Sequence, residues 1–490
     1  MAIALFHARM LRRSIGVAAA ALAFASPAVH AAETAAPTLA LPQVVAHALS
    51  VQRYGEVGRA RNALDAASGA ALIAEGAFDW SLRSRTGYDR IWQPGINNNF
   101  LTADVQTFNV LSSTLYAERQ FQSGIRVRPG FIVTREPDNF RSDLARLGNR
   151  PLLQVDVPLD RNFGEPPDTL RLQAAQSDVE AARSDTELAR QSHLHRVMSA
   201  VWTQIAAREK VSVNRELAGR LEDVAERTAK LARAGEAASL AADELRSRAA
   251  LARALAERDS IDVTAARLQL ATLIGVAPES FGGVAGDLPR VTSATIQRRR
   301  LSEYVDEAMK RRPELRGYTN RVQAAKLRGL VGEREVDSQL TLTVGHDRLL
   351  LNYYTPLGDN RRKGAQQQAL AGVNAAEDNL EEARQRVRVE TELALEKLVA
   401  SRTAIDRANA ALGTTRERLQ LVEMLVDNGR QAPASLADAA DQFASARRQT
   451  IDASLIYALA LADFRRATGA IPDGGAEPAT IAALFLSEQP

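Results

Sequence analysis

The 490-residue chain contains no cysteine. This absence excludes disulfides, thiolate metal sites, a cysteine nucleophile and a lipid anchor on an N-terminal cysteine. Aromatic residues make up only 5% of the chain while alanine is abundant, a balance that suits long packed helices better than a large globular core. After the N-terminal region no apolar run reaches the roughly eighteen residues of a transmembrane helix, so any membrane crossing is expected to use β-strands.

The N-terminal region has the features of a secretory signal. Three arginines precede a short apolar stretch over Ile15–Ala25, and Val29–Ala31 offers small residues for cleavage. We therefore expect residues 1–31 to be removed on export. This segment holds three of the 62 basic residues and no acid, so the remaining chain carries 59 residues of each sign. Nucleic-acid binding, which needs a basic surface, is not predicted.

Two parts of the chain match each other at a constant offset. Three glycines of the first part recur in the second: Gly219, Gly235 and Gly275 match Gly413, Gly429 and Gly469. Because three glycines in one gapless register rarely arise by chance, we interpret the pattern as an internal duplication. The predicted organisation is a first repeat over 32–275, a linker over 276–299, a second repeat over 300–469 and a C-terminal tail over 470–490, which we expect to pack loosely.

Both repeats have the same predicted order of elements. The first has a helix over Leu41–Glu75, strands within 78–159, a long helix over Asp168–Arg233 and a returning helix over Glu236–Ile274. The second has a helix over Leu301–Glu335, strands within 338–357, a long helix over Ala365–Asp427 and a returning helix over Ala434–Thr468. About 65 helical residues reach roughly 100 Å, so each long helix needs neighbours along its length. Frequent alanine and near-heptad spacing favour antiparallel coiled-coil pairing.

Apolar and polar residues alternate in the strand regions. Phe78, Trp80 and Leu82 alternate with polar residues in the first repeat, as do Leu340 and Leu342 in the second. A membrane barrel with a wet lumen needs this alternation, although a soluble sheet with one solvated face gives the same pattern. Export, few strands and very long helices together favour the barrel. Too few strands are present to close it within one chain, so several chains are expected to contribute.

Several segments resemble motifs of the TolC family of outer-membrane efflux proteins. They are the opening helix at Arg312–Leu315, the strand-to-helix junction at Pro356–Arg362, the helix tips at Arg233–Ser239 and Asn428–Arg430, and the helix endings at Leu273–Gly275 and Ala467–Gly469. Together they cover nearly the whole chain after the signal, in the order that the family has them.

The resemblance implies a fold that is mainly α with a small β part. Long antiparallel coiled-coil helices would form a periplasmic α-barrel, and two strands per repeat would contribute to a twelve-stranded, trimeric transmembrane β-barrel. The family's members form homotrimers in outer-membrane lipid. They work with a periplasmic adaptor (membrane fusion) protein and an inner-membrane transporter, in efflux pumps or type I secretion systems. The chain departs from the pattern by extra strand material between Arg90 and Arg150, and by almost no loop between Arg348 and Leu349.

The predicted site residues lie near the two glycine turns. Small residues at a helix tip let another backbone approach, so we predict that the adaptor docks on Ala234, Gly235, Glu236, Ser239, Asn428, Gly429 and Arg430. The alternative is that both glycines only cap their helices. Glu244 and Asp438, each nine residues past its glycine, are predicted to form an acidic ring at the periplasmic gate of a trimer. The resemblance supports Asp438 in particular. Both residues could instead be ordinary acids of a helix surface.

The chain lacks the sequence motifs of common enzymes. It has no P-loop, no Gly-x-Ser-x-Gly, no His-Glu-x-x-His and no dinucleotide fingerprint. His193 and His195 fall on different faces of a helix, which disfavours a metal site. We therefore predict no enzymatic activity, cofactor or bound metal. Two functions remain: a transport duct, or a non-channel periplasmic scaffold of coiled coil. Conduction of ions by the purified trimer distinguishes them.

Overall fold

The computed structural model describes residues 37–51, 55–96, 103–137, 145–235, 239–291, 301–472 and 476–486. They all belong to one unit, Pro37–Pro490. The predicted signal over 1–31 and the predicted tip residue Glu236 lie outside the described residues. Among the described residues, no helix combines the length and the apolar character needed to cross a bilayer.

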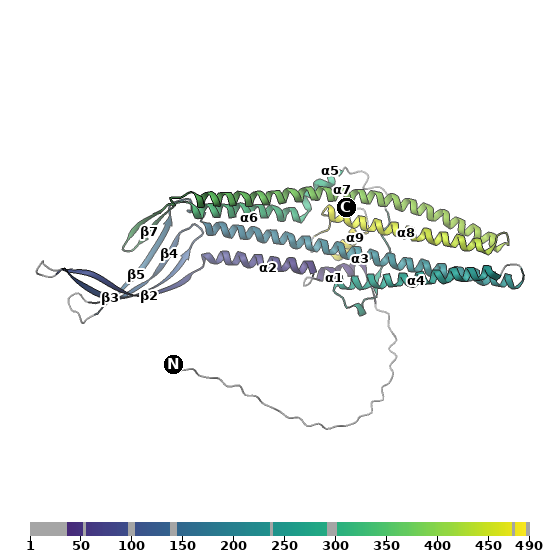
Figure 1. The fold of residues 1–490 in the computed structure, drawn as a ribbon, viewed down its shortest axis with the longest axis horizontal. Coiled ribbons are helices and arrows are strands. Elements are labelled where there is room, and N and C mark those ends of the chain that lie inside the picture. The colour runs from purple at the N-terminus through teal and green to yellow at the C-terminus, as the bar shows by residue number, and fades with distance from the viewer. Residues whose placement is uncertain are drawn as a thin grey trace, which may run out of the picture. The chain divides into compact units, whose positions relative to one another are not determined.

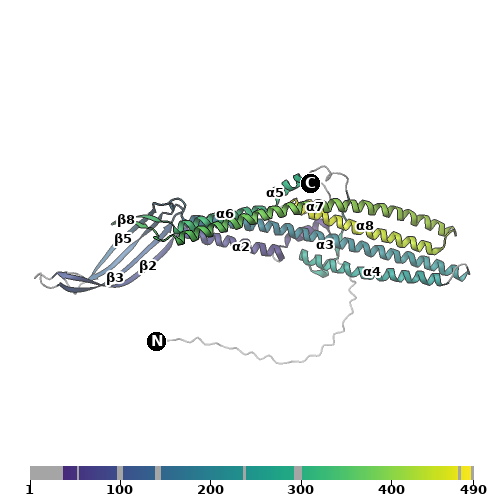
Figure 2. The same ribbon diagram turned by 45° about the horizontal axis from the view of Figure 1, so that its top comes forward.

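Two long helical hairpins dominate the structure. The first consists of α3, Pro167–Arg233, and α4, Ser239–Ile274; the second consists of α7, Asn360–Asp427, and α8, Pro433–Ala467. Proline is the first residue of both α3 and α8, where its missing N–H has no helical partner to lose. The hairpins lie side by side, with their tips at the end away from the sheet (Figures 1 and 2). The predicted antiparallel pairing of long helices is confirmed.

Each hairpin turns at the predicted glycine. Gly235 has φ +80° and Gly429 has φ +70°, in the left-handed region where a residue with a Cβ is strained. At the second tip, the backbone N–H of Arg430 donates to the carbonyl of Leu425 over 2.8 Å. This six-residue bond is the closure of a Schellman cap. The glycine therefore ends α7 and lets the chain reverse.

The two shorter helical segments differ from the expectation of one helix each. The segment over 41–75 contains α1, Leu41–Ser50, and α2, Gly55–Glu75, and Gly55 has φ +72°, outside the helical region. The segment over 301–335 contains α5, Leu301–Arg311, and α6, Pro313–Val336. Pro313 ends the first of these helices because it has no N–H for the helical hydrogen bond, and it starts the second.

Six of the described strands form one antiparallel sheet. Its strands in order are β2 (Ser81–Ile96), β3 (Ala103–Gln120), β4 (Arg126–Pro137), β5 (Ala145–Pro158), β7 (Gln339–Gly345) and β8 (Leu349–Tyr354). The first half supplies four strands, two more than the resemblance implies for each repeat, and the extra strand material noted between Arg90 and Arg150 accounts for the difference. The extra turn, between β3 and β4, is fixed by Gly124, whose φ is +88° and whose Cβ would lie 2.8 Å from the carbonyl oxygen of Asn162. Phe78, expected at the start of a strand, lies buried in the 3-10 turn Gly76–Phe78.

The main apolar core surrounds the middle of α3. Val197, Met198 and Trp202 are fully buried there. The core continues into α9, Pro478–Leu484, and the adjoining Phe485 is only 1% exposed. The expectation that the C-terminal tail packs loosely is therefore wrong, because α9 packs on α1 through apolar side chains.

The predicted linker over 276–299 also contains ordered structure. It includes the 3-10 turn Pro278–Ser280 and β6, Gly283–Ala285, which pairs in parallel with β1, Thr38–Ala40. The described elements follow one order in both halves: helices, strands, a long helix and a returning helix. The duplication itself stays an inference from the sequence.

Candidate functional site

The six-stranded sheet has one apolar face and one polar face. Side chains alternate along each strand, and residues paired across strands share a face. The exposed apolar side chains therefore gather on one side: Leu82, Tyr88, Leu111, Leu115, Phe131, Val133, Leu153, Val344, Leu349, Leu351 and Tyr353. The predicted alternation is confirmed, and its apolar side has no covering element within the described chain.

Basic residues bound this apolar face at both ends. At the helix end, the guanidinium of Arg119 lies 5.8 Å from the ring centre of Trp80 and 5.2 Å from that of Phe121. At the far end, Arg135 pairs in register with Leu111. Eight residues of β3 separate Arg119 from Leu111, about 27 Å at about 3.4 Å per residue.

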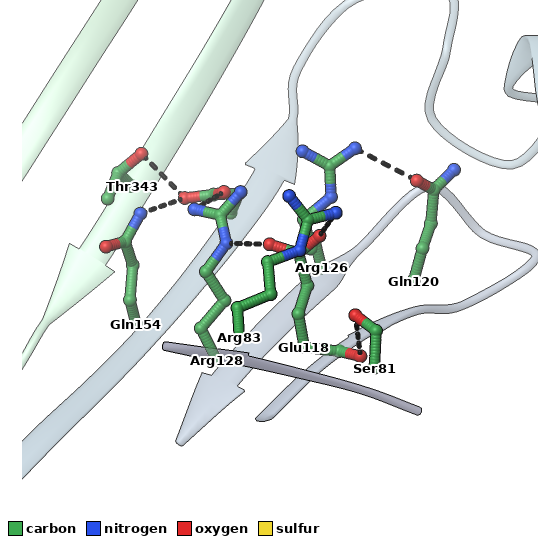
Figure 3. A network of polar contacts seen from close by, with 9 residues as sticks. Ser81, Arg83, Glu118, Gln120, Arg126, Arg128, Gln154 and Thr343 are labelled. Carbon is green, nitrogen blue, oxygen red and sulfur yellow. Dashed lines mark hydrogen bonds and ion pairs between the residues drawn. The ribbon is translucent and has the colours of Figure 1, made fainter. Parts of the chain in front are cut away.

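The polar face carries a row of charges near the helices (Figure 3). Arg128 donates from Nε to Glu118 over 2.5 Å, and its Nη1 lies 2.7 Å from Asp156. Arg83 approaches Glu118 from the other side, with Nη2 at 3.2 Å. The hydroxyl of Thr343 donates to Asp156 over 2.9 Å. Positive and negative groups thus alternate from β2 to β5, and Thr343 attaches the row to β7.

Positive charge is in excess at this level of the sheet. Arg85 lies two residues beyond Arg83 on the same face and is exposed. Within the described residues, no carboxylate forms an ion pair with Arg85. The β8 sequence, Leu349–Tyr354, contains no charged residue that could balance it from the other edge of the sheet. Asp89 lies on the same face of β2, so the two arginines exceed the carboxylates of this strand by one charge.

A groove of about 920 Å³ lies between the two helix tips. Its lining combines apolar side chains with the basic residues Arg227, Lys230 and Arg430. The lining residues are Val224, Arg227, Thr228, Lys230, Leu231, Ala241, Leu245, Val426, Asp427, Gly429, Arg430, Gln431, Ala432, Pro433, Ala434 and Leu436. Arg227 donates from Nη1 to Asp427 over 3.1 Å, which joins the end of α3 to the end of α7.

The predicted tip residues divide into two groups. Gly429 and Arg430 of the second tip line the groove. Ala234, Gly235 and Ser239 of the first tip do not line it, and the first hairpin contributes instead through the preceding turns of α3 and the early part of α4. Asn428 caps α7 by donating from its side chain to the carbonyl of Met424 over 2.8 Å.

The two predicted gate acids lie on opposite sides of one arginine. Arg248 of α4 donates from Nη1 to Asp438 over 2.6 Å and from Nη2 to Glu244 over 2.9 Å. Asp441 lies 3.7 Å from the same Nη1. The structure therefore brings Glu244 and Asp438 to the same guanidinium. Asp243 faces away from this cluster and pairs with Arg246.

The cluster around Arg248 holds more carboxylates than arginines. Three carboxylates share the one guanidinium of Arg248, whose pKa is raised chiefly by the hydrogen bond to Asp438. Burial, together with nearby Asp438, raises the pKa of Asp441. Sequence reasoning did not identify Arg248, although its position four residues after Glu244 is typical of a helical ion pair.

The two histidines do not face a common site. His195 contacts Asp463 of α8, with Nε2 at 2.7 Å from the carboxylate, while His193 is buried and its pKa is lowered by that burial. No group of three or more metal-binding side chains occurs in the described part of the chain.

Comparisons with known proteins support the fold. No protein-family model and no curated protein matches the sequence. Solved structures do match. The outer-membrane channel OprN is 18% identical, with 88% of this chain and 89% of that chain covered and a TM-score of 0.63. The outer membrane protein VceC from Vibrio cholerae is 14% identical, with coverage of 88% and 96% and a TM-score of 0.63. The CmeC outer membrane channel of Campylobacter jejuni is 13% identical, with coverage of 91% and 89% and a TM-score of 0.61.

The fold is therefore that of an outer-membrane channel protein. More particularly it is the TolC-like fold, with long helical hairpins joined to a smaller sheet, as the sequence motifs predicted.

Proposed function

We propose that the chain forms a homotrimeric channel of the bacterial outer membrane and serves as the exit duct of an efflux pump or a type I secretion system. The observation that carries this proposal is the sheet, which is apolar on one face and charged on the other, joined to helices of 67 and 68 residues. Strands β2 to β5, of 12 to 18 residues, are each longer than the 9–11 residues that span a bilayer. The helices would then extend into the periplasm.

The trimer is supported by the open sheet. Six strands of one chain end at two free edges, β2 and β8. A sheet of six strands is too narrow to close around a lumen, so other copies must complete it. Three copies are the number expected from the TolC-like fold.

We propose further that a periplasmic adaptor docks at the helix tips, with an inner-membrane transporter beyond it. The groove between the tips supports this role, because it combines apolar side chains with the exposed backbone turn at Gly429. The predicted contacts of the first tip, Ala234, Gly235 and Ser239, would lie beside this groove rather than within it. A crosslinker placed at Arg430 is expected to capture the adaptor. If an intact trimer gives no such crosslink, Gly429 only caps its helix.

The gate is proposed at the cluster of Glu244, Asp438 and Arg248. In a trimer the cluster occurs three times. Its excess negative charge favours the passage of cations over anions and the binding of divalent cations. Arg248 would hold α4 to α8 and so keep the entrance narrow. Replacing Asp438 with alanine should weaken the block by millimolar divalent cations about threefold, because each cluster loses one of its three acids. Unchanged block would remove Asp438 from the gate.

The overall proposal is tested by locating the protein and recording its conductance. Outer-membrane fractionation and the mass of the unboiled oligomer should show a trimer in the outer membrane, and the purified trimer should conduct ions across a planar bilayer. Recovery as a soluble periplasmic monomer contradicts the proposal. A trimer that does not conduct would favour the non-channel periplasmic scaffold of coiled coil instead.

A further inference from the structure

The three hairpins of the sheet are very unequal in length. Strands β2 to β5 have 16, 18, 12 and 14 residues, whereas β7 has seven and β8 has six. At about 3.4 Å per residue, the short hairpin extends only about 24 Å along its strands, before any tilt. It ends in a charged turn, where Asp347 lies 3.7 Å from His346 and 3.4 Å from Arg348.

The short hairpin leaves part of β5 unpaired. β7 pairs with β5 only over Gln154–Pro158. The remaining nine residues, 145–153, pair with β4 on one side and have a free edge on the other. The outer edge of β2 is free over all 16 of its residues. Both free edges border the apolar face that holds Leu82, Tyr88 and Leu153.

Free edges of this length cannot stay open in a membrane. Each unpaired backbone N–H or C=O in hydrocarbon costs several kcal/mol, so strands that cross a bilayer pair along their whole length. Nine residues are the length of a tilted transmembrane strand. The edge of β5 therefore needs a partner strand at membrane depth, and β7 is too short to be that partner.

We propose, on the basis of the channel function above, that β5 of one copy pairs directly with β2 of the next copy. Each copy then contributes four membrane-crossing strands, β2 to β5, all from the first half of the chain. The trimer has twelve strands across the membrane. The β7–β8 hairpin lies between neighbouring copies only at the base, where the ring widens to eighteen strands.

Strand direction and length both agree with this pairing. Strands alternate in direction along the sheet, so β5 and the next copy's β2 run antiparallel whether or not the two-stranded hairpin separates them. The next copy's β2 has 16 residues to pair. The six residues of β8 at the base and the nine free residues of β5 above it can pair with all but one of them. The apolar faces also coincide, since Leu153 and Leu82 lie on the same side of the sheet.

The absence of native cysteine makes disulfide mapping direct. Tyr88→Cys on β2 is combined with single cysteines at each position from 147 to 153 on β5, and the trimer is oxidised in membranes. Covalent trimers on a denaturing gel are expected with a period of two, strong at Asn149, Pro151 or Leu153 and weak at Arg150 and Leu152. The period arises because only alternate side chains share a face with Tyr88. Each single-cysteine variant is a control and should stay monomeric on the gel.

A second series uses the short hairpin. Tyr88→Cys combined with cysteine at Leu351 or Tyr353 of β8, which lie nearer the base, should give no covalent trimer. Crosslinking to β8 but not to β5, in a trimer that still conducts, overturns the inference and leaves the proposed function standing. A chain that forms no trimer and no conducting channel overturns the proposed function itself. The two failures are therefore distinguishable.

Discussion

The sheet and the helix tips hold their charges in different ways. On the polar face of the sheet, Arg128 lies between Glu118 and Asp156, so opposite charges alternate from strand to strand. At the tips, the single guanidinium of Arg248 serves three carboxylates. An alternating row is neutralised locally and stiffens the strands it joins. One arginine shared by three carboxylates leaves a net negative charge. Replacing that arginine breaks all three ion pairs at once.

The largest effect is expected on the sheet. Arg128→Gln removes the cation shared by Glu118 and Asp156, which are both mostly buried. Removing one partner of a buried ion pair is strongly destabilising, because the other charge stays buried without compensation. We expect the trimer to lose about 2 kcal/mol of stability, measured as the temperature at which the unboiled trimer dissociates. Arg83→Gln is the matched control, since Arg83 is 59% exposed and its pair should contribute under about 1 kcal/mol. Equal losses from both variants would contradict the alternating-row interpretation.

The next effect is expected at the tips. Arg248→Gln removes the cation that contacts Glu244, Asp438 and Asp441, so divalent cations should block the conducting trimer about tenfold more tightly, about 1.4 kcal/mol. The concentration of divalent ion that halves the single-channel conductance measures this. Arg246→Gln is the control, because Arg246 pairs only with Asp243 outside the cluster. If divalent cations block the two variants equally, the cluster does not line the ion pathway.

A smaller effect separates docking from capping. Gly429→Val forces a β-branched residue into φ +70° and should cost about 1 kcal/mol through the cap. Gly413→Val, inside α7 with open space around it, should cost nothing, because it replaces the poorest non-proline helix former. Thermal dissociation of the trimer gives the stability difference, and crosslinking to the adaptor gives the docking. Docking that survives in the folded Gly429 variant would leave the glycine with a capping role alone.

The smallest effect is expected from Arg85, and it tests whether the sheet is positively charged where the cluster near the helix tips is negatively charged. Arg85 adds unbalanced positive charge on the polar face of the sheet. Arg85→Gln should move the reversal potential in a salt gradient by a few millivolts toward cation selectivity, since a wide lumen screens one charge strongly. Arg90→Gln is the control on the opposite face and should leave the potential unchanged. A larger shift from Arg90 would mean that the faces of the sheet are assigned the wrong way round.

Local signals allowed much of the fold to be predicted. The positive φ at Gly235 and Gly429 follows from glycine placed after a long periodic segment, and both turns occur there. Alternation along β2 and β7 similarly predicted which side of the sheet is apolar. These features depend on residues close together in the chain.

What depended on distant residues was missed. Extra strand material was expected between Arg90 and Arg150, but the pairing of β5 with β7, a strand of the second half, was not predicted. Arg248 was not recognised because its role comes from Asp438, 190 residues away. The burial of Phe485 likewise depends on α1, which no local pattern around the tail encodes.

The length of α8 turns small rotations into large displacements. Its 35 residues extend about 50 Å, so a pivot of about two degrees at Ala467 carries Pro433 about 2 Å sideways. The contact between Arg248 and Asp438, at 2.6 Å near the moving end, does not survive such a displacement. Because the arm is long, the ion pair between Arg248 and Asp438 is sensitive to the angle of α8 at its far end, near Ala467.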